Sequence, residues 1–287
     1  MDRPFSPALR WIGVALVLAG VLAAVILTPG GFLRKLDYVG AAVCHRRLSH
    51  SFEIAGHQTP LCQRCSGTFP GALVGVLVHW ALWRRRRSAR FPRWPVFVAC
   101  LLFAAFWGLD GINSTSSDGS FYALLTRFVA RPLGTGALGY APQPWLRVLT
   151  GVLMGMSMSI ILVPAFNQSL WADGEDQATL RTGRELVQLI AIEVGLAALI
   201  LALEATQSRV ALTIIAALTA LGPIAMFTLL GAMIFVLVLK RDATMHGWRE
   251  AWVPLIWGVV FALVMVVGMD SLRLWLTGTI DGVPGLK

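Results

Sequence analysis

The chain has 287 residues, of which 56% are hydrophobic and only 14% are charged, and its mean hydropathy is +0.70. A soluble domain carries about 25% charged residues, so this composition excludes an ordinary soluble enzyme and predicts an all-α, polytopic bundle of transmembrane helices. The formal net charge is +9. Because the arginines lie in short loops and the sequence has no nucleic-acid-binding motif, we attribute this charge to membrane orientation and expect no nucleic-acid partner.

Seven apolar segments are long enough to cross a hydrocarbon core of about 30 Å. In chain order they cover residues 11–28, 67–83, 94–112, 145–166, 186–203, 210–239 and 251–269. The sixth segment has 30 residues, so we expect it to tilt or bend. Pro223 inside this segment predicts the position of a kink.

The most basic loop predicts the orientation. The segment WRRRRSARFPRW (83–94) contains six arginines and no acid, so the positive-inside rule places it in the cytoplasm. Alternation of the spans then predicts a cytoplasmic N-terminus and an extracytoplasmic C-terminus in a multi-pass protein of the inner (cytoplasmic) membrane, in contact with its lipids. The segment 29–66, which we interpret as an outer loop, then faces an oxidising compartment in which disulfides are permitted.

The outer segment concentrates side chains that bind soft metals. Cys44 is followed directly by His45, and 18 residues after Cys44 a C-x-x-C motif begins at Cys62 and ends at Cys65. The two sulfurs of such a motif converge in a tight turn, and three thiolates with one histidine form a ligand set for tetrahedral Zn²⁺. We therefore predict a zinc site here. Its ligands are Cys44, Cys62, Cys65 and one of the histidines His45, His50 and His57, with His45 as the first choice.

Two alternatives stay open for the same cysteines. In the first, Cys62 and Cys65 are the dithiol of a quinone-linked thiol-disulfide oxidoreductase. Such a relay needs a second thiol pair, and only Cys44 is left outside because Cys100 lies in the third span, which favours the metal. In the second, the cysteines only staple the outer loop of a non-catalytic subunit or transporter. A membrane-protein partner or a homo-oligomer is compatible with any of these interpretations.

Ionisable side chains at membrane depth are costly, so each is a hypothesis of function. Asp110 lies near the outer end of the third span and Arg147 near the outer start of the fourth, on the face predicted to carry the cysteines. We expect these two residues to form a polar site, in which they could pair, and we name them as candidate catalytic residues. Glu193 lies in the middle of the fifth span, where it could relay protons or hydrogen-bond to a neighbouring helix.

Small residues predict one tight helix contact. Gly67, Gly71 and Gly75 recur every four residues along the second span, a pattern that lets another helix approach closely. The segment 121–134 has apolar residues at helical spacing and predicts an interfacial amphipathic helix.

Four motifs occur in one order, namely CHRRLSHSF (44–52), PLCQRCSGTFPG (60–71), LDGINS (109–114) and LRVLTGVLMG (146–155). Together they resemble a family of bacterial and archaeal membrane proteins known as domain of unknown function 2085, over about residues 40–159. The resemblance implies that the cysteines, Asp110 and Arg147 belong to one module and that the last three spans are an addition. The family name implies no activity.

The chain is accordingly divided into three parts. They are a Cys/His-containing four-helix membrane module (1–166), an acidic cytoplasmic loop that we expect to be solvated and mobile (167–185), and a three-helix membrane extension (186–287). The favoured interpretation is an integral membrane metalloprotein. If it is an enzyme, the most concrete hypothesis is metal-assisted chemistry on a lipid-like or anionic substrate, with Arg46 and Arg64 binding an anionic group such as a lipid phosphate.

Overall fold

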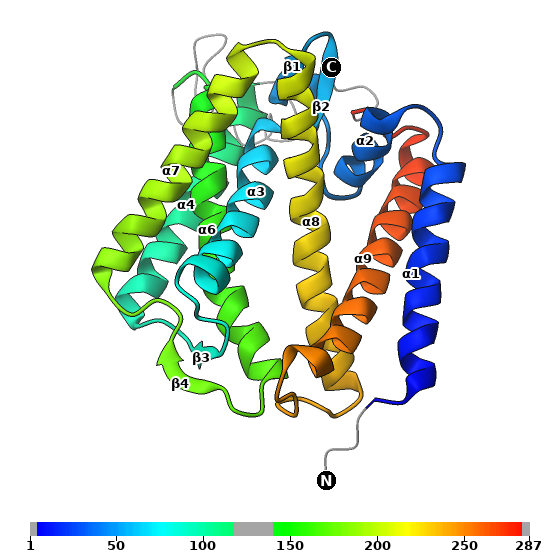
Figure 1. The fold of residues 1–287 in the computed structure, drawn as a ribbon. Coiled ribbons are helices and arrows are strands. Elements are labelled where there is room, and N and C mark those ends of the chain that lie inside the picture. The colour runs from blue at the N-terminus through cyan, green and yellow to red at the C-terminus, as the bar shows by residue number, and fades with distance from the viewer. Residues whose placement is uncertain (1–4, 118–139, 283–287) are drawn as a thin grey trace.

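A computed structural model describes residues 5–117 and 140–282 of the chain as a bundle of helices (Figure 1). The predicted amphipathic helix 121–134 lies outside the described residues. Seven of the described helices are long and apolar enough to cross a membrane, which confirms the predicted spans. They are α1 (Pro7–Leu27), α3 (Gln63–Leu77, continued by a π-helical turn at Val78–Leu82), α4 (Trp94–Ser117), α6 (Pro144–Leu170), α7 (Gly183–Ala205), α8 (Arg209–Val238) and α9 (Trp248–Thr277).

Helices α3 and α6 form the centre of the bundle. More than half of each span is buried, 56% for α3 and 61% for α6, whereas α1 at the periphery is only 6% buried. Between α3 and α6 the predicted glycine face makes its close contact, because a Cβ atom on Gly67 would lie 2.4 Å from the carbonyl oxygen of Val148. The opposing face of α6 also carries small residues, since a Cβ on Gly155 would lie 2.1 Å from the carbonyl oxygen of Thr68. The predicted close helix approach is therefore confirmed, with α6 as the partner.

The segment 29–66, which we predicted to be an outer loop, is folded rather than a simple loop. It contains α2 (Phe32–Val43), a 3₁₀ turn at Leu48–His50, and an antiparallel hairpin of β1 (Ser51–Ile54) and β2 (His57–Cys62). Ile54 pairs with His57, so a two-residue turn of Ala55 and Gly56 connects the strands. Both turn residues have positive φ, 52° and 76°, which is the backbone of a tight type I′ hairpin turn.

The acidic segment 167–185 differs from the mobile loop that we predicted. Helix α6 continues to Leu170, and β4 (Glu175–Ala178) pairs in parallel with β3 (Ser88–Arg90) of the arginine-rich loop. Ion pairs join the two segments, among them Arg87 with Asp173 and Arg85 with Glu185. The acids of one loop thus pair with Arg85, Arg87 and Arg90 of the other. Residues 172–177 are exposed, whereas Leu170, Trp171, Thr179 and Leu180 are buried, so only the middle of the segment is solvated as predicted.

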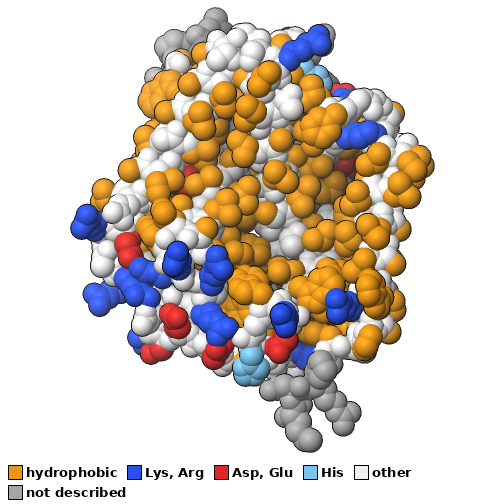
Figure 2. Space-filling model, viewed as in Figure 1, with side chains coloured by type: hydrophobic (Ala, Val, Ile, Leu, Met, Phe, Trp, Pro, Cys, Tyr) orange, Lys and Arg blue, Asp and Glu red, His pale blue; other side chains and the backbone are white. Residues whose placement is uncertain are grey.

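The helices place the hairpin and the β3–β4 pair at opposite ends of the bundle (Figure 1). Helix α1 begins at the β3–β4 end, and α9 ends at the hairpin end beside α2. Figure 2 shows charged side chains gathered over the β3–β4 end, while hydrophobic side chains cover the middle of the bundle. This distribution is that of a bundle whose middle faces lipid and whose ends face water.

Candidate metal centre

Two chain segments meet to form the cysteine cluster at the hairpin end. Helix α2 ends at Cys44, where the backbone becomes extended, and β2 ends at Cys62, directly before α3. The α2 backbone comes close to β2, since a Cβ on Gly40 would lie 2.0 Å from the carbonyl oxygen of Pro60. Glycine at position 40 therefore permits the approach that brings Cys44 next to Cys62.

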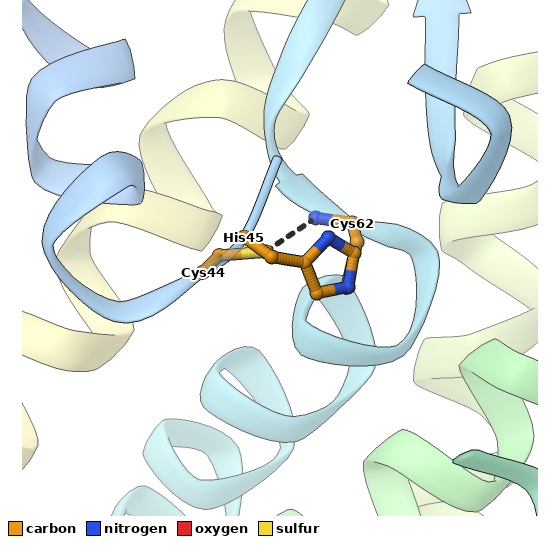
Figure 3. Close-up of side chains that lie close together, drawn as sticks. All are labelled: Cys44, His45 and Cys62. Carbon is orange, nitrogen blue, oxygen red and sulfur yellow. Dashed lines mark hydrogen bonds between the residues drawn. The ribbon is translucent and has the colours of Figure 1, made fainter. Parts of the chain in front are cut away.

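The structure brings three of the predicted ligands together. One candidate ligand atom from each of Cys44, His45 and Cys62 lies within 4.8 Å of the other two (Figure 3). Side chains of adjacent residues rarely converge on one point, yet candidate ligand atoms of Cys44 and His45 lie within 4.8 Å of each other. Arg46 has a φ of 51°, in the left-handed region that a residue with a side chain adopts only at a cost.

Cys65 adjoins this group of three. Its thiol interacts with the thiols of both Cys44 and Cys62, because one turn of α3 carries its side chain back toward the start of the helix. Cys44 and Cys62 are buried and Cys65 is partly buried, and all four cysteines of the chain are free thiols in the structure. Cys100 lies apart from the cluster in α4, among apolar side chains.

The three candidate histidines take different positions. His45 lies at the cysteines, and His50 packs edge-on against its ring, with the ring centroids 5.4 Å apart. Nε2 of His57 lies instead 3.2 Å from the carboxylate of Asp37. His45 is therefore the histidine that the fold presents to the sulfurs.

Hydrogen bonds concentrate on the sulfur of Cys44. The backbone N–H groups of Arg46 and Cys62 donate to this sulfur at 3.5 and 3.3 Å. Hydrogen bonds from the thiols of Cys62 and Cys65 hold the pKa of Cys44 well below its ordinary value, against the opposing effect of burial. The hydrogen bond to Cys44 raises the pKa of Cys62 to about 12. The neighbouring thiols therefore favour the ionised form of Cys44 over that of Cys62.

The surroundings of His45 disfavour its charged form. Burial lowers the pKa of its imidazole, and the positive charges of Arg47, Arg64 and Arg273 act in the same direction, against the opposing charge of Cys44. The backbone N–H of Arg47 donates to Nδ1 at 3.0 Å. A neutral imidazole is the form that binds metals, and its free electron pair here lies on Nδ1. A metal bound through Nδ1 would therefore replace this hydrogen bond.

Both arginines that we assigned to an anion are paired with acids of the chain. Arg46 is buried and lies 2.9 Å from the carboxylate of Asp37, while Arg64 lies 2.7 Å from the carboxylate of Asp110. Neither guanidinium is a free cation, so the arrangement speaks against an open anion site at these two residues.

Asp110 and Arg147 lie in one polar network beside the first turn of α3. The ion-pair partner of Asp110 is Arg64, whereas Arg147 donates to Gln63 Oε1 at 2.9 Å. The hydroxyl of Ser114 joins the two halves, since it accepts from Arg64 Nη2 and from Arg147 Nε, both at 3.1 Å. The predicted convergence of Asp110 and Arg147 on one face is thus seen, with Arg64 as the cation that the sequence did not connect to Asp110.

Two residues that contribute to the hairpin end carried no signal in the sequence, Tyr140 in the network of Asp110 and Arg273 beside the cysteine cluster. Tyr140 donates its hydroxyl to Asp110 at 3.1 Å, and burial raises the pKa of that hydroxyl. Arg273, near the end of α9, donates to the backbone carbonyls of Ala41, Cys44 and His45 at 2.9, 2.5 and 2.9 Å. Backbone carbonyls are present at every residue, so no side-chain motif marks such a contact.

Glu193 belongs to α7 and lies outside this centre. It faces α3 nearer the middle of the bundle. Its side chain is fully buried against Gly71 and Gly75, and both carboxylate oxygens lack a hydrogen-bond partner within the described part of the chain. The structure therefore supplies no hydrogen bond for the predicted role in joining helices.

Comparison with known proteins identifies part of the chain. An uncharacterised protein of Methanocaldococcus jannaschii is 30% identical over 67 residues, which are 23% of this chain. The aligned segment spans 42% of that relative, less than half its length. No solved structure matches the chain. Residues 44–161, which contain all four cysteines and both candidate catalytic residues, match the family described as "Predicted membrane protein (DUF2085)", and this match confirms the family that the four motifs resemble.

Proposed function

We propose that this membrane protein binds a thiophilic divalent metal, zinc, through Cys44, His45, Cys62 and Cys65. The observation that carries the proposal is the mutual approach of three ligand atoms from two segments to within 4.8 Å, with a third thiol in contact with the first two. Four tetrahedral ligands at zinc–sulfur distances of about 2.3 Å stand about 3.8 Å apart. The three ligand atoms of Cys44, His45 and Cys62 therefore need only a small contraction to hold the ion, and Cys65, which lies outside this group of three, would move in as the fourth ligand.

The surroundings support a metal–thiolate centre. Three thiolates and one neutral imidazole around Zn²⁺ carry a net charge of −1, which buried sites tolerate only with nearby compensation. Arg47, Arg64 and Arg273 supply positive charge close to His45, and backbone N–H groups already point at Cys44 Sγ. Such outer contacts orient metal ligands and tune their basicity.

The ligand set favours a structural metal over a catalytic one. Four protein ligands close the coordination sphere, whereas catalytic zinc sites retain a position for water or substrate. The metal would tie the end of α2 to the start of α3, and the hairpin between them would be pinned with both. We do not propose an anionic-lipid reaction at Arg46 and Arg64, because internal carboxylates already neutralise both guanidinium groups.

The test is metal analysis of the full-length protein purified in detergent. We expect about one zinc per chain, lost on Cys44→Ser and on Cys62→Ser. Cys100→Ser is the matched control, because Cys100 is also buried but packs among apolar residues of another cluster, and it should retain the metal. Replacement by Co²⁺ should add thiolate-to-cobalt absorption that the same two variants remove.

The same preparation tests the redox alternative. A metal-free wild-type protein in which Cys62 and Cys65 form a reducible disulfide would overturn the zinc proposal and favour thiol exchange. Burial of Cys44 and Cys62 argues against this result, because exchanging thiols must be reached by their partners.

A further inference from the structure

Two neighbouring cavities lie at the opposite end of the bundle, beside the β3–β4 pair. A cavity of about 400 Å³ is lined by Arg90, Phe91, Arg93 and Arg181 together with β4 residues from Asp176 to Ala178. A second cavity of about 440 Å³ shares Arg93, Leu180 and Arg181 with the first, so the two adjoin each other. Volumes of this size are typical of sites for small ligands.

Positive charge dominates the first cavity. Its lining contains three arginines and one acid, Asp176, which lies 3.2 Å from Arg90. Among the described residues, the acid paired with the Arg181 guanidinium is Glu175, at a distance of 4.0 Å. Within residues 5–117 and 140–282 no ion pair is found for Arg93, whose side chain is exposed. Two of the three guanidinium groups are therefore available to an anion.

Apolar side chains dominate the second cavity. Pro95 and Val96 come from the start of α4, while Leu186 comes from the start of α7. These residues begin two membrane-spanning helices, so the apolar wall continues from the arginines toward the middle of the bundle. Trp94, which is 73% exposed, stands at the same level, where tryptophan marks the boundary between headgroups and hydrocarbon.

The N-terminal ends of α4 and α7 also attract an anion to these cavities. Arg93 directly precedes α4, and Arg181 lies two residues before α7. The N-terminal end of a long helix carries partial positive charge and favours phosphate. The arginines and the two helix ends thus attract the same kind of group from adjoining walls.

We propose that this double cavity binds one anionic phospholipid. The phosphate lies among Arg93, Arg181 and Arg90, and the acyl chains extend along Pro95, Val96 and Leu186 between α4 and α7. A basic pocket next to an apolar wall at the membrane surface fits both parts of such a lipid, whereas a soluble phosphate would use only the charged part. This site is independent of the cysteine cluster at the other end of the bundle.

The experiment measures lipid retained by the full-length protein in native mass spectrometry. The protein is titrated with phosphatidylglycerol or with phosphatidylcholine of the same acyl chains. We expect tighter binding of phosphatidylglycerol, weakened about 30-fold by Arg93→Gln with Arg181→Gln, since each arginine contributes about a fivefold preference near a membrane surface. Arg84→Gln with Arg184→Gln is the matched control, because both arginines lie at the same end but do not line either cavity, and it should bind as the wild type does.

Two outcomes overturn the proposal. Equal binding of the two lipids, or equal weakening by the cavity and control variants, would show that only diffuse surface charge acts. Displacement of the lipid by inorganic phosphate at similar concentration would show a site for a soluble anion. Zinc content measured in the same samples reports separately on the cysteine cluster, so failure of one proposal leaves the other tested on its own.

Discussion

Arg273 donates to the backbone carbonyl oxygens of Cys44 and His45 at 2.5 and 2.9 Å. These carbonyls belong to two predicted metal ligands, but Arg273 lies in α9, more than one hundred residues beyond the segment 44–161 that matches the family. The same guanidinium also donates to the carbonyl of Gly282 at 2.7 Å. The C-terminal helix thus holds the segment that carries the cysteine cluster, as an outer contact of the proposed metal.

Replacing this arginine should weaken metal binding without removing a ligand. We expect Arg273→Gln to lower zinc affinity about 10- to 100-fold, the range seen when outer-shell contacts are removed, because the Cys44–His45 backbone loses its anchor. Competition with a chromophoric chelator measures this affinity. Arg209→Gln, an exposed arginine at the start of α8, is the control. Unchanged affinity in Arg273→Gln would limit Arg273 to holding the C-terminal segment.

The close contact of α3 and α6 predicts a strong effect of adding one methyl group. A Cβ on Gly155 would lie 2.1 Å from the carbonyl oxygen of Thr68, so the two helices must separate. We expect Gly155→Ala to lower the free energy of unfolding by about 1–3 kcal/mol, the usual cost of overpacking. Gly195→Ala in α7 meets nothing within 4 Å and should leave stability unchanged or raise it slightly. Equal effects in thermal unfolding would contradict this explanation.

The transmembrane helices and their tightest contact could be predicted from local sequence, because apolar length and glycine spacing are local properties. The positions at which the helices end could not be predicted in this way. The polar residue Asn167, which we took as the start of a loop, remains in α6 because its amide donates to the carbonyl of Ser88 at 2.8 Å. That contact spans 79 residues, so no local pattern contains it.

The candidate site, too, could be predicted only in part from local sequence. Residue type and spacing marked the cysteines, Asp110 and Arg147, but the partner of Asp110 depends on how α3 and α4 face each other. The hairpin of β1 and β2 was missed because its turn is Ala55-Gly56, whereas Asn-Gly is the common signature for this geometry. Arg273 was missed because it contacts backbone atoms, which no pattern of side chains identifies.

The ion pair of Arg64 and Asp110 predicts coupled effects on stability. Asp110 is 2% exposed and Arg64 is 12% exposed, with 2.7 Å between the charged atoms. Breaking such a buried pair leaves one charge uncompensated, so Asp110→Asn and Arg64→Gln should each cost about 3–5 kcal/mol. The double variant should cost clearly less than the sum, as a double-mutant cycle in thermal or chemical unfolding would show.

A purely additive result for the two substitutions would show that the residues act separately. Zinc content provides a second measurement. Because Asp110 is not a metal ligand in our proposal, Asp110→Asn should retain zinc at temperatures at which it is folded. Loss of zinc from a folded Asp110→Asn variant would place this carboxylate closer to the metal than we propose.

The pair of Arg34 and Asp281 predicts how stability depends on pH. Two hydrogen bonds from the Arg34 guanidinium, at 2.6 and 2.7 Å, hold the pKa of Asp281 below its ordinary value. A carboxyl whose pKa is lower in the folded state stabilises the protein fully above the unfolded value of about 3.9, and this contribution is lost as the pH falls through the folded pKa. Because Asp281 is 48% exposed, solvent screening keeps the contribution small.

Removal of the Asp281 carboxylate should therefore lower stability only at pH values at which this group is ionised. We expect Asp281→Asn to lower the unfolding temperature at neutral pH and the difference from wild type to shrink toward zero below about pH 4, where the unfolded carboxyl becomes protonated. Asp242→Asn, which removes an exposed acid from the turn after α8, controls for the change in net charge. A difference that grows as the pH falls would mean that Arg34 does not stabilise the ionised form, because the linkage would then have the opposite sign.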